Sequence, residues 1–139
     1  MIIQSNNKDF IMPRKGSATA GAFDIFMPES GSVDGTTQLI GLGFSAAVPA
    51  GHVALLLPRS SIGAKHGLEL NNTTGVIDSD YRGEWVAALR TKTGLKYKWN
   101  AGDRLIQFLI VPVTNVTLHR VDSLDETIRG IGGFGSTGL

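Results

Sequence analysis

Every second residue between Ile40 and Val48 is apolar, and most of the residues between them are small. This alternation is typical of a strand with one buried face. Other short apolar runs, separated by Gly, Pro, Asn or Asp, predict further strands. At least nine strands are expected, among residues 1–3, 21–26, 40–48, 52–57, 68–72, 76–77, 85–91, 95–99, 104–113 and 116–121. Many short strands with hardly any helix predict an all-β sandwich or jelly roll.

Residues 58–68, PRSSIGAKHGL, carry the one helical signal. Ser60 or Ser61 is expected to cap a helical turn, and Gly67 to end it. Arg59 and the two serine hydroxyls also suit an anion, because a helix start offers free N–H groups. A capped surface turn and an anion site both remain open on these residues alone.

Residues 104–113 are almost all apolar and lack clear alternation. Such a strand is predicted to be buried on both faces. In a small all-β protein the second buried face indicates a contact between subunits. Arg104 and Gln107 are the polar exceptions, and they need partners if they are buried.

The composition narrows the classes of function. The 139 residues fit one domain, and 13 basic residues nearly balance 12 acidic ones. This balance argues against a nucleic-acid or membrane-surface binder, but not against a small phosphorylated ligand. There is no cysteine, and the three histidines lack metal-ligand spacing. No signal peptide or membrane-spanning run is present, so a soluble, cytoplasmic protein is expected.

Two acidic residues stand out by their surroundings. The segment GVIDSDYRGE, residues 75–84, is interpreted as a hairpin that places Asp78 at a polar turn. Asp78 is therefore either a catalytic carboxylate or a turn-forming residue. Asp24 lies in the apolar run 21–26, where it either has a buried partner or faces solvent from an edge strand.

The end of the chain is rich in glycine. Residues 129–138, RGIGGFGSTG, cannot build a core and are expected to be mobile when free. The segment lacks the Gly-Lys-Ser/Thr pattern of a Walker loop. Arg129 and Phe134 favour an arm that orders on a ligand, although a disordered tail remains the alternative.

Taken together, these segments resemble the trimeric dUTP pyrophosphatases (dUTPases) along the whole chain. The five motifs of that family have counterparts in order: AGAFDI at 20–25, PRSSIGAKHGL at 58–68, GVIDSDYRGE at 75–84, GDRLIQ at 102–107 and RGIGGFGSTG at 129–138. The third and fifth are the most specific. Departures from the usual pattern are Ala22 for glycine, Ser61 for glycine and Ile106 for a small residue.

The resemblance implies a jelly-roll-like (β-clip) protomer, residues 1–128, with a flexible C-terminal arm, residues 129–139. Three protomers would form a homotrimer with active sites shared between subunits. The implied reaction is hydrolysis of dUTP to dUMP and pyrophosphate, which lowers dUTP and supplies dUMP for dTMP synthesis. The cofactor would be Mg²⁺, held mainly by the triphosphate, with Asp24 contacting it through water.

The resemblance also implies roles for individual residues. Asp78 would be the general base for in-line water attack on the α-phosphate. Tyr81 would exclude a ribose, and Phe134 would cover the uracil. The other substrate-binding residues would be Arg59, Ser60, Ser61, Asn72, Gly75, Val76, Ile77, Gln107, Arg129, Gly135, Ser136 and Thr137.

Two alternatives remain at this stage. The first is a dCTP deaminase, or a bifunctional dCTP deaminase and dUTPase, in which Glu84 would act at the base. The second is a regulatory role, in which the same scaffold binds a protein partner that the sequence does not identify.

Overall fold

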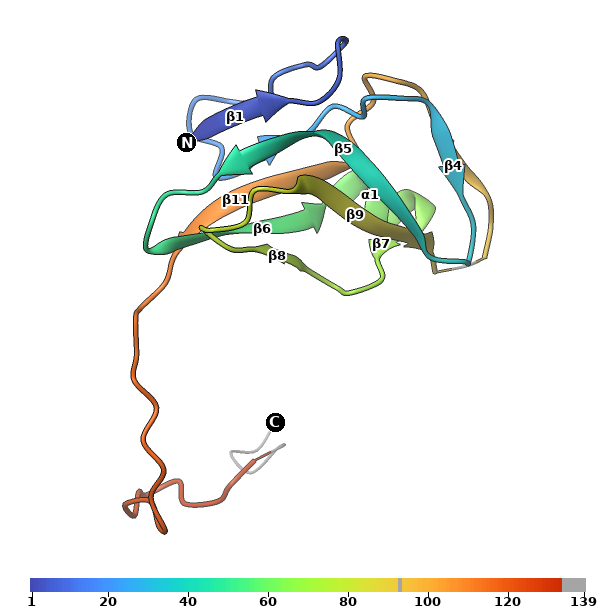
Figure 1. Cartoon of the computed structure of the whole chain (residues 1–139). Coiled ribbons are helices and arrows are strands. Elements are labelled where there is room, and N and C mark those ends of the chain that lie inside the picture. Colours follow the sequence, from blue (N-terminus) through green and yellow to red (C-terminus); the bar gives the residue numbers. More distant parts are fainter. Residues whose placement is uncertain (93, 134–139) are drawn as a thin grey trace.

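Two antiparallel sheets face each other across the protein (Figure 1). The structure is a computed structural model that describes residues 1–92 and 94–133. The four-stranded sheet has the order β1 (Ile2–Ser5), β5 (Gln38–Ala47), β9 (Glu84–Thr91) and β7 (Leu68–Leu70). The five-stranded sheet has the order β2 (Arg14–Lys15), β3 (Phe23–Asp24), β11 (Ile106–Pro112), β6 (His52–Pro58) and β8 (Gly75–Ile77). A separate pair joins β4 (Gly31–Val33) and β10 (Tyr97–Trp99).

The hydrophobic core lies between the two larger sheets. Phe44 and Trp85 project from the four-stranded sheet, with ring centroids 5.0 Å apart. Trp85 meets Phe108 of the five-stranded sheet edge to face, at 5.2 Å. All three side chains are buried. The predicted all-β sandwich is confirmed. The buried face of the strand predicted at residues 40–48 is confirmed too: of its five apolar residues, four are buried and Ile40 is half-buried.

The pairing of β5 with β9 contains an irregularity between Gly41 and Ser45. Gly43 has φ +78°, a left-handed conformation that favours glycine. Its N–H donates to Glu84 Oε1 at 2.9 Å. Glu84, the first residue of β9, is thereby anchored to β5.

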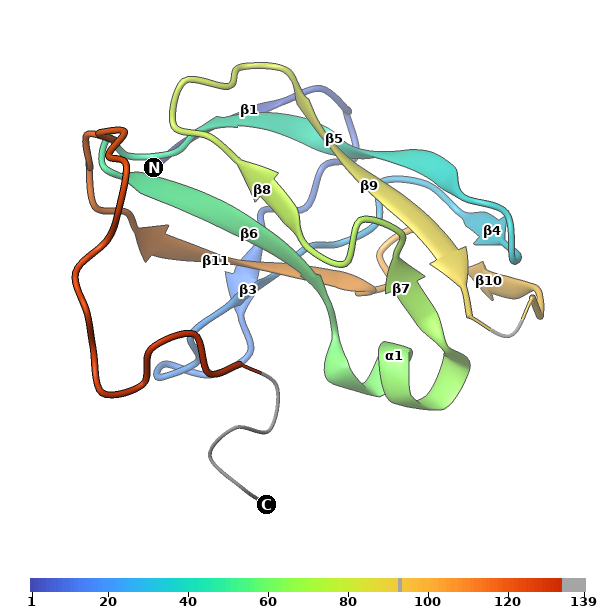
Figure 2. The ribbon, with the colours of Figure 1, turned by 90° about the horizontal axis from the view of Figure 1, so that it is seen from below.

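The single helix of the described chain, α1 (Ser60–His66), joins β6 to β7 (Figure 2). The prediction that Ser60 or Ser61 caps it is wrong. Arg59 is the N-cap residue, and no side chain accepts the cap hydrogen bond. Arg59 O instead accepts from the N–H groups of Ile62 and Gly63. The predicted C-cap is confirmed, because Gly67 adopts φ 62°.

Residues 75–84 do not form the predicted β-hairpin. β8 pairs with β6 in the five-stranded sheet, whereas β9 pairs with β5 and β7 in the four-stranded sheet. Residues 78–83 therefore cross from one sheet to the other. A strand–turn–strand sequence indicates two strands, but it does not determine whether they pair with each other.

The last strand and the segment after it form the C-terminal part of the described chain. In β11 only Ile106 and Phe108 are buried, so one chain covers a single face of this strand. The predicted burial of its other face against a second subunit stays a prediction. The predicted strand at 116–121 is not formed. Residues 112–131 are exposed, and beyond Val113 the described hydrogen bonds stay within residues 127–132. The segment leaves the body (Figure 1), and none of the described strands lies beside it.

Candidate active site

A buried carboxylate joins two arginines at the end of the five-stranded sheet. Asp24 Oδ1 lies 2.9 Å from Arg59 Nε, and Asp24 Oδ2 lies 3.0 Å from Arg104 Nη1. The sheet brings them together because β3 and β6 both pair with β11. Asp24 is only 7% exposed, so the alternative of a solvent-facing Asp24 is wrong.

The neighbouring polar groups are held by the backbone. Arg59 Nη1 donates to Arg104 O at 3.3 Å, and Arg59 N–H donates to Leu105 O at 2.8 Å. Gln107 Nε2 donates to Pro58 O at 3.2 Å. These bonds hold the start of β11 against the end of β6. The positions of the charged groups are therefore set before any ligand binds.

A pocket of about 360 Å³ opens beside this cluster. Its polar lining comes from Asp24, Arg59, Ser60 and Gln107, and the rest from residues of the 16–22 loop. Two guanidinium groups against one carboxylate leave a net positive charge. Ser60 is exposed at its rim, so a hydroxyl donor is also available. Such a pocket suits a phosphate group.

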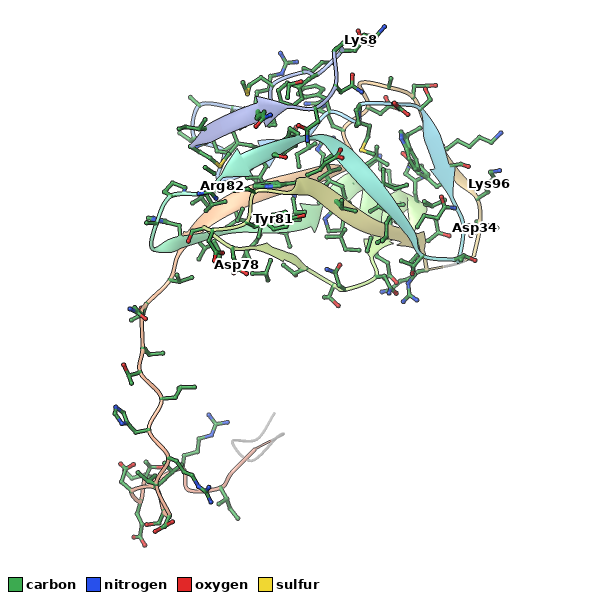
Figure 3. All side chains as sticks on the ribbon, viewed as in Figure 1. Lys8, Asp34, Asp78, Tyr81, Arg82 and Lys96 are labelled. Carbon is green, nitrogen blue, oxygen red and sulfur yellow. The ribbon has the colours of Figure 1, made fainter. Side chains whose placement is uncertain are left out.

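Asp78 lies in the loop that crosses between the sheets (Figure 3). This loop follows β8, which lies on the other side of β6 from Asp24. Asp78 O accepts from Tyr81 N–H at 3.2 Å, which closes a turn. Arg82 Nη1 donates to Ser79 O at 2.8 Å and to Tyr81 O at 3.0 Å. Asp78 itself is exposed. The loop is thus braced by its own arginine while the carboxylate stays accessible.

Tyr81 has a defined position in this loop. Its hydroxyl donates to Glu84 O at 3.1 Å. The ring lies over Gly83, where a Cβ atom would come within 2.3 Å of Tyr81 Oη. Glycine at position 83 is therefore required for this placement of the ring.

Strand β8 offers a free edge next to Asp78. Among the described residues it pairs only with β6, so its other side leaves backbone donors and acceptors unpaired in the sheet. Val76 is 59% exposed there, whereas Gly75 is buried and its Cβ position would meet Leu56 at 3.0 Å. Asn72 is exposed in the loop before β8. This strand can recognise the edge of a planar ligand through its backbone.

The two groups of residues lie far apart within one chain. Asp24 shares a row of the sheet with Gln107 and Leu57, whereas Ile77, just before Asp78, pairs with Ala54. At about 3.3 Å per residue and about 4.8 Å per strand, Asp78 lies roughly 20 Å from Asp24. A base must lie within one water of the phosphate it serves. If Asp78 is the base of this reaction, each described chain carries the two parts of the site separately, and they are called half-sites below.

The predicted arm residues are in neither half-site. Arg129 is exposed on the projecting segment, where its Nε donates to Gly132 O at 3.0 Å. Phe134, Gly135, Ser136 and Thr137 lie outside the described residues. Arg104 was predicted to need a partner, which is Asp24, but it was not predicted as a site residue. Its signal was a charged residue at the start of an apolar strand, three residues before Gln107.

No group of three or more His, Asp or Glu residues that could hold a metal ion occurs in the described part of the chain. Asp24 has both oxygens engaged by arginines, but an ionised carboxylate accepts about four hydrogen bonds. It therefore fits a contact to Mg²⁺ through water, with most ligands supplied by a nucleotide. No helix of the described residues is long and apolar enough to cross a membrane.

The family model described as dUTPase matches residues 8–138. The chain belongs to the dUTPase family. A deoxyuridine 5'-triphosphate nucleotidohydrolase of Maricaulis maris is 47% identical over 104 residues, covering 75% of this chain and 68% of the relative. One of the same name from Dictyoglomus turgidum is 34% identical over 145 residues, covering 100% of this chain and 98% of the relative.

Solved structures of dUTPases share the fold. The dUTPase of Staphylococcus bacteriophage 80alpha with dUPNHPP superposes with a TM-score of 0.89 at 25% sequence identity. The match covers 99% of this chain and 98% of the phage chain. The two-sheet arrangement described above is thus the fold of a dUTPase.

Proposed function

We propose that this protein hydrolyses dUTP to dUMP and pyrophosphate at a site shared between copies of the chain. Membership of the dUTPase family carries the reaction. The roughly 20 Å between Asp24 and Asp78 supports sharing, since neither half-site is complete. We infer a homotrimer in which Arg59, Ser60, Ser61 and Gln107 of one subunit face Asp78 of another.

The phosphate half-site neutralises charge. Arg59 and Arg104 are held by Asp24, so the guanidinium groups need no reorganisation when a triphosphate binds. The hydroxyls of Ser60 and Ser61 and the amide of Gln107 supply further polar contacts. Mg²⁺, when bound with the nucleotide, would supply positive charge that offsets the charge of the phosphates. Asp24 is the residue that would hold the ion, through water.

The loop after β8 supplies the base. Asp78 is exposed at the end of a strand, and its backbone carbonyl is fixed in a turn. The carboxylate accepts a proton from the water that attacks the α-phosphorus, and pyrophosphate leaves in line. Because a carboxylate is a weak base, most of the acceleration comes from placing the water correctly.

Recognition of uracil and deoxyribose belongs to the same segment. The free edge of β8 at Gly75, Val76 and Ile77, helped by Asn72, bonds the uracil edge. Cytosine would leave those backbone groups unpaired, which is costly in a closed site. The ring of Tyr81, locked over Gly83, leaves no space for a 2′-hydroxyl.

The arm completes the site. Residues 129–139 of a third subunit close over the nucleotide, with Arg129 on the γ-phosphate and Phe134 on the uracil. Stacking of this kind contributes about 1–3 kcal/mol per base. Gly135, Ser136 and Thr137 add donors. The body, residues 1–128, and the arm are thus distinct functional units.

The deaminase alternative is not favoured. It requires a free glutamate at the base, but Glu84 accepts a hydrogen bond from Gly43 N–H in the body of the fold. Pyrophosphate release from dUTP, UTP, dTTP and dCTP with Mg²⁺ separates the two reactions. Release from dUTP alone is expected, and ammonia release from dCTP would overturn the proposal.

Mixed oligomers test the shared site. Asp78→Asn and Arg59→Ala chains are each expected to be inactive. When the two are unfolded and refolded together, about a quarter of the sites combine an intact half from each chain. Activity near a quarter of wild type is expected. A mixture as inactive as its parents would show that each site belongs to one chain.

A further inference from the structure

A second pocket, of about 360 Å³, lies at the far end of α1 from the phosphate half-site. Its lining includes Lys65 and His66 of the helix, Lys92 after β9, and Leu95, Lys96 and Tyr97 before and in β10. The rings of His66 and Tyr97, which both line it, have centroids 4.8 Å apart. The side chain of Leu95 is exposed.

The pocket carries excess positive charge. Glu69 Oε1 accepts a hydrogen bond from Arg90 Nε at 2.8 Å, and Glu69 Oε2 lies 3.8 Å from Lys92 Nζ. This single carboxylate neutralises only part of the positive charge. Lys65 and Lys96 take part in no ion pair with the described residues. The reaction proposed above uses none of these groups.

The projecting segment has the complementary pattern. Asp122, Asp125 and Glu126 surround Leu124, and all four residues are exposed. In the pocket, Lys92 and Lys96 flank Leu95 in the same way. Leu124 can pack against Leu95 while the acidic side chains around Leu124 pair with the lysines around Leu95.

We propose that residues Asp122–Glu126 of a second copy of the chain dock in this basic pocket. The proposal rests on the shared site proposed above, because it specifies how the arm is guided to it. No backbone hydrogen bond joins residues 122–126 to the described part of the body, and the segment projects away from it (Figure 1).

The lengths agree with this role. The seven residues of α1 span about 10 Å at ~1.5 Å per residue. Arg129 lies three residues beyond Glu126, which corresponds to about 10 Å of extended chain. An arm docked at the end of α1 therefore brings Arg129 to the start of α1, where Arg59 lines the phosphate pocket. Docking raises the effective concentration of the arm at that site.

Crosslinking between separately labelled chains tests the docking directly. The chain has no cysteine, so Lys96→Cys and Glu126→Cys each introduce one reactive thiol. The two variants are refolded together and treated with a short bismaleimide. Crosslinked dimer on a denaturing gel is expected. Leu39→Cys, exposed on β5, is the matched control for Lys96→Cys and should give only background.

Two crosslinking outcomes would overturn the proposal. One is a yield no higher than that of the Leu39→Cys control. The other is a Lys96→Cys/Glu126→Cys double variant that crosslinks within single chains, while the mixed variants give no dimer. Neither readout depends on hydrolysis, so failure of the proposed reaction would be seen separately in the pyrophosphate assay.

Charge exchange gives an independent measurement. Lys65→Glu/Lys96→Glu alone, or Asp125→Lys/Glu126→Lys alone, is expected to raise KM for dUTP about three- to tenfold at low salt. The combined variant should recover most of that loss, which a folding defect would not do. Additive losses in the combined variant would contradict the pairing.

Discussion

Asp24 and Asp78 have different surroundings, and we expect different roles for them. Asp24 is buried and ion-paired to Arg59 and Arg104, so it holds the phosphate half-site together. Asp78 is exposed in a loop braced by Arg82 and Glu84. One substitution at each position tests the role proposed for each residue.

Asp24→Asn should lower the free energy of unfolding by about 1–3 kcal/mol, because two guanidinium groups lose a charged acceptor. Urea unfolding followed by tryptophan fluorescence measures the change. The expected loss in free energy of unfolding is smaller than for a fully buried ion pair, because both arginines are partly exposed. Unchanged unfolding would mean that the ion pairs contribute nothing.

Asp78→Asn should leave the free energy of unfolding within about 0.5 kcal/mol of wild type, since the carboxylate is exposed. Its kcat for dUTP should fall about 10²–10⁴-fold while nucleotide binding is retained. Calorimetric titration with a nonhydrolysable analogue measures the binding. Turnover close to wild type would remove Asp78 as the base.

Tyr81→Ala should raise hydrolysis of UTP relative to dUTP, because the ring no longer blocks a 2′-hydroxyl. Gly83→Ala should have the same effect with Tyr81 intact, since a Cβ there would displace the Tyr81 hydroxyl. Tyr81→Phe keeps the ring and is the control. The ratio of kcat/KM for the two nucleotides is the readout. An unaltered ratio in Tyr81→Ala would exclude Tyr81 from sugar selection.

At the level of elements, position in the sheets matters more than sequence neighbourhood. β8 and β9 are joined by six residues, yet they belong to different sheets. This crossing leaves β8 as an edge strand and places Asp78 beside its free edge. Within the described part of the chain β10 pairs only with the short β4, so its stability depends on contacts such as the one between the rings of Tyr97 and His66 at the end of α1.

Tyr97 links the stability of this region to pH. Burial, reinforced by the negative charge of Asp103, raises the pKa of Tyr97 above its ordinary value of 10.0. The unfolded chain then releases this proton at lower pH than the folded protein does. The contribution of Tyr97 to stability is therefore complete below pH 10 and declines above it.

The melting temperature of wild type should accordingly fall more steeply above pH 10 than that of Tyr97→Phe. The difference between the two proteins, measured by scanning calorimetry, removes the effects of other groups that titrate in this range. Parallel curves would show that Tyr97 ionises alike in the folded and unfolded chains.

At the level of the whole molecule, one chain ends its body at β11 and sends an exposed segment outward (Figure 1). In the same chain, Asp24 and Asp78 lie far apart. Assembly of several copies would explain both the exposed segment and this separation, because each copy would then complete sites on the others.

Removal of residues 129–139 should leave the oligomer intact and reduce kcat/KM for dUTP by at least about tenfold, because the arm's stacking and charge contacts are lost. Analytical ultracentrifugation measures the mass, and pyrophosphate release measures the rate. Identical kinetics in the truncated protein would mean that these residues are only a tail.

Local sequence patterns were sufficient to predict several elements of this protein and its family. The alternation between Ile40 and Val48 predicted a strand with an inward face, because a pleated strand exposes successive side chains to opposite sides. Gly67 predicted the helix end, because it adopts a left-handed conformation there. The motifs around Asp78 and Arg129 indicated the dUTPase family, which the comparisons confirm.

Other features depend on contacts between residues distant in sequence, and only the tertiary structure determined them. The pairing of β8 with β6 and the two arginines on Asp24 are of this kind. The predicted strand at 116–121 was wrong for the same reason. Its alternating side chains suit a strand, but a strand forms only where another strand offers its backbone groups. The sequence thus determined the local elements and the family, and the tertiary contacts determined which elements pair.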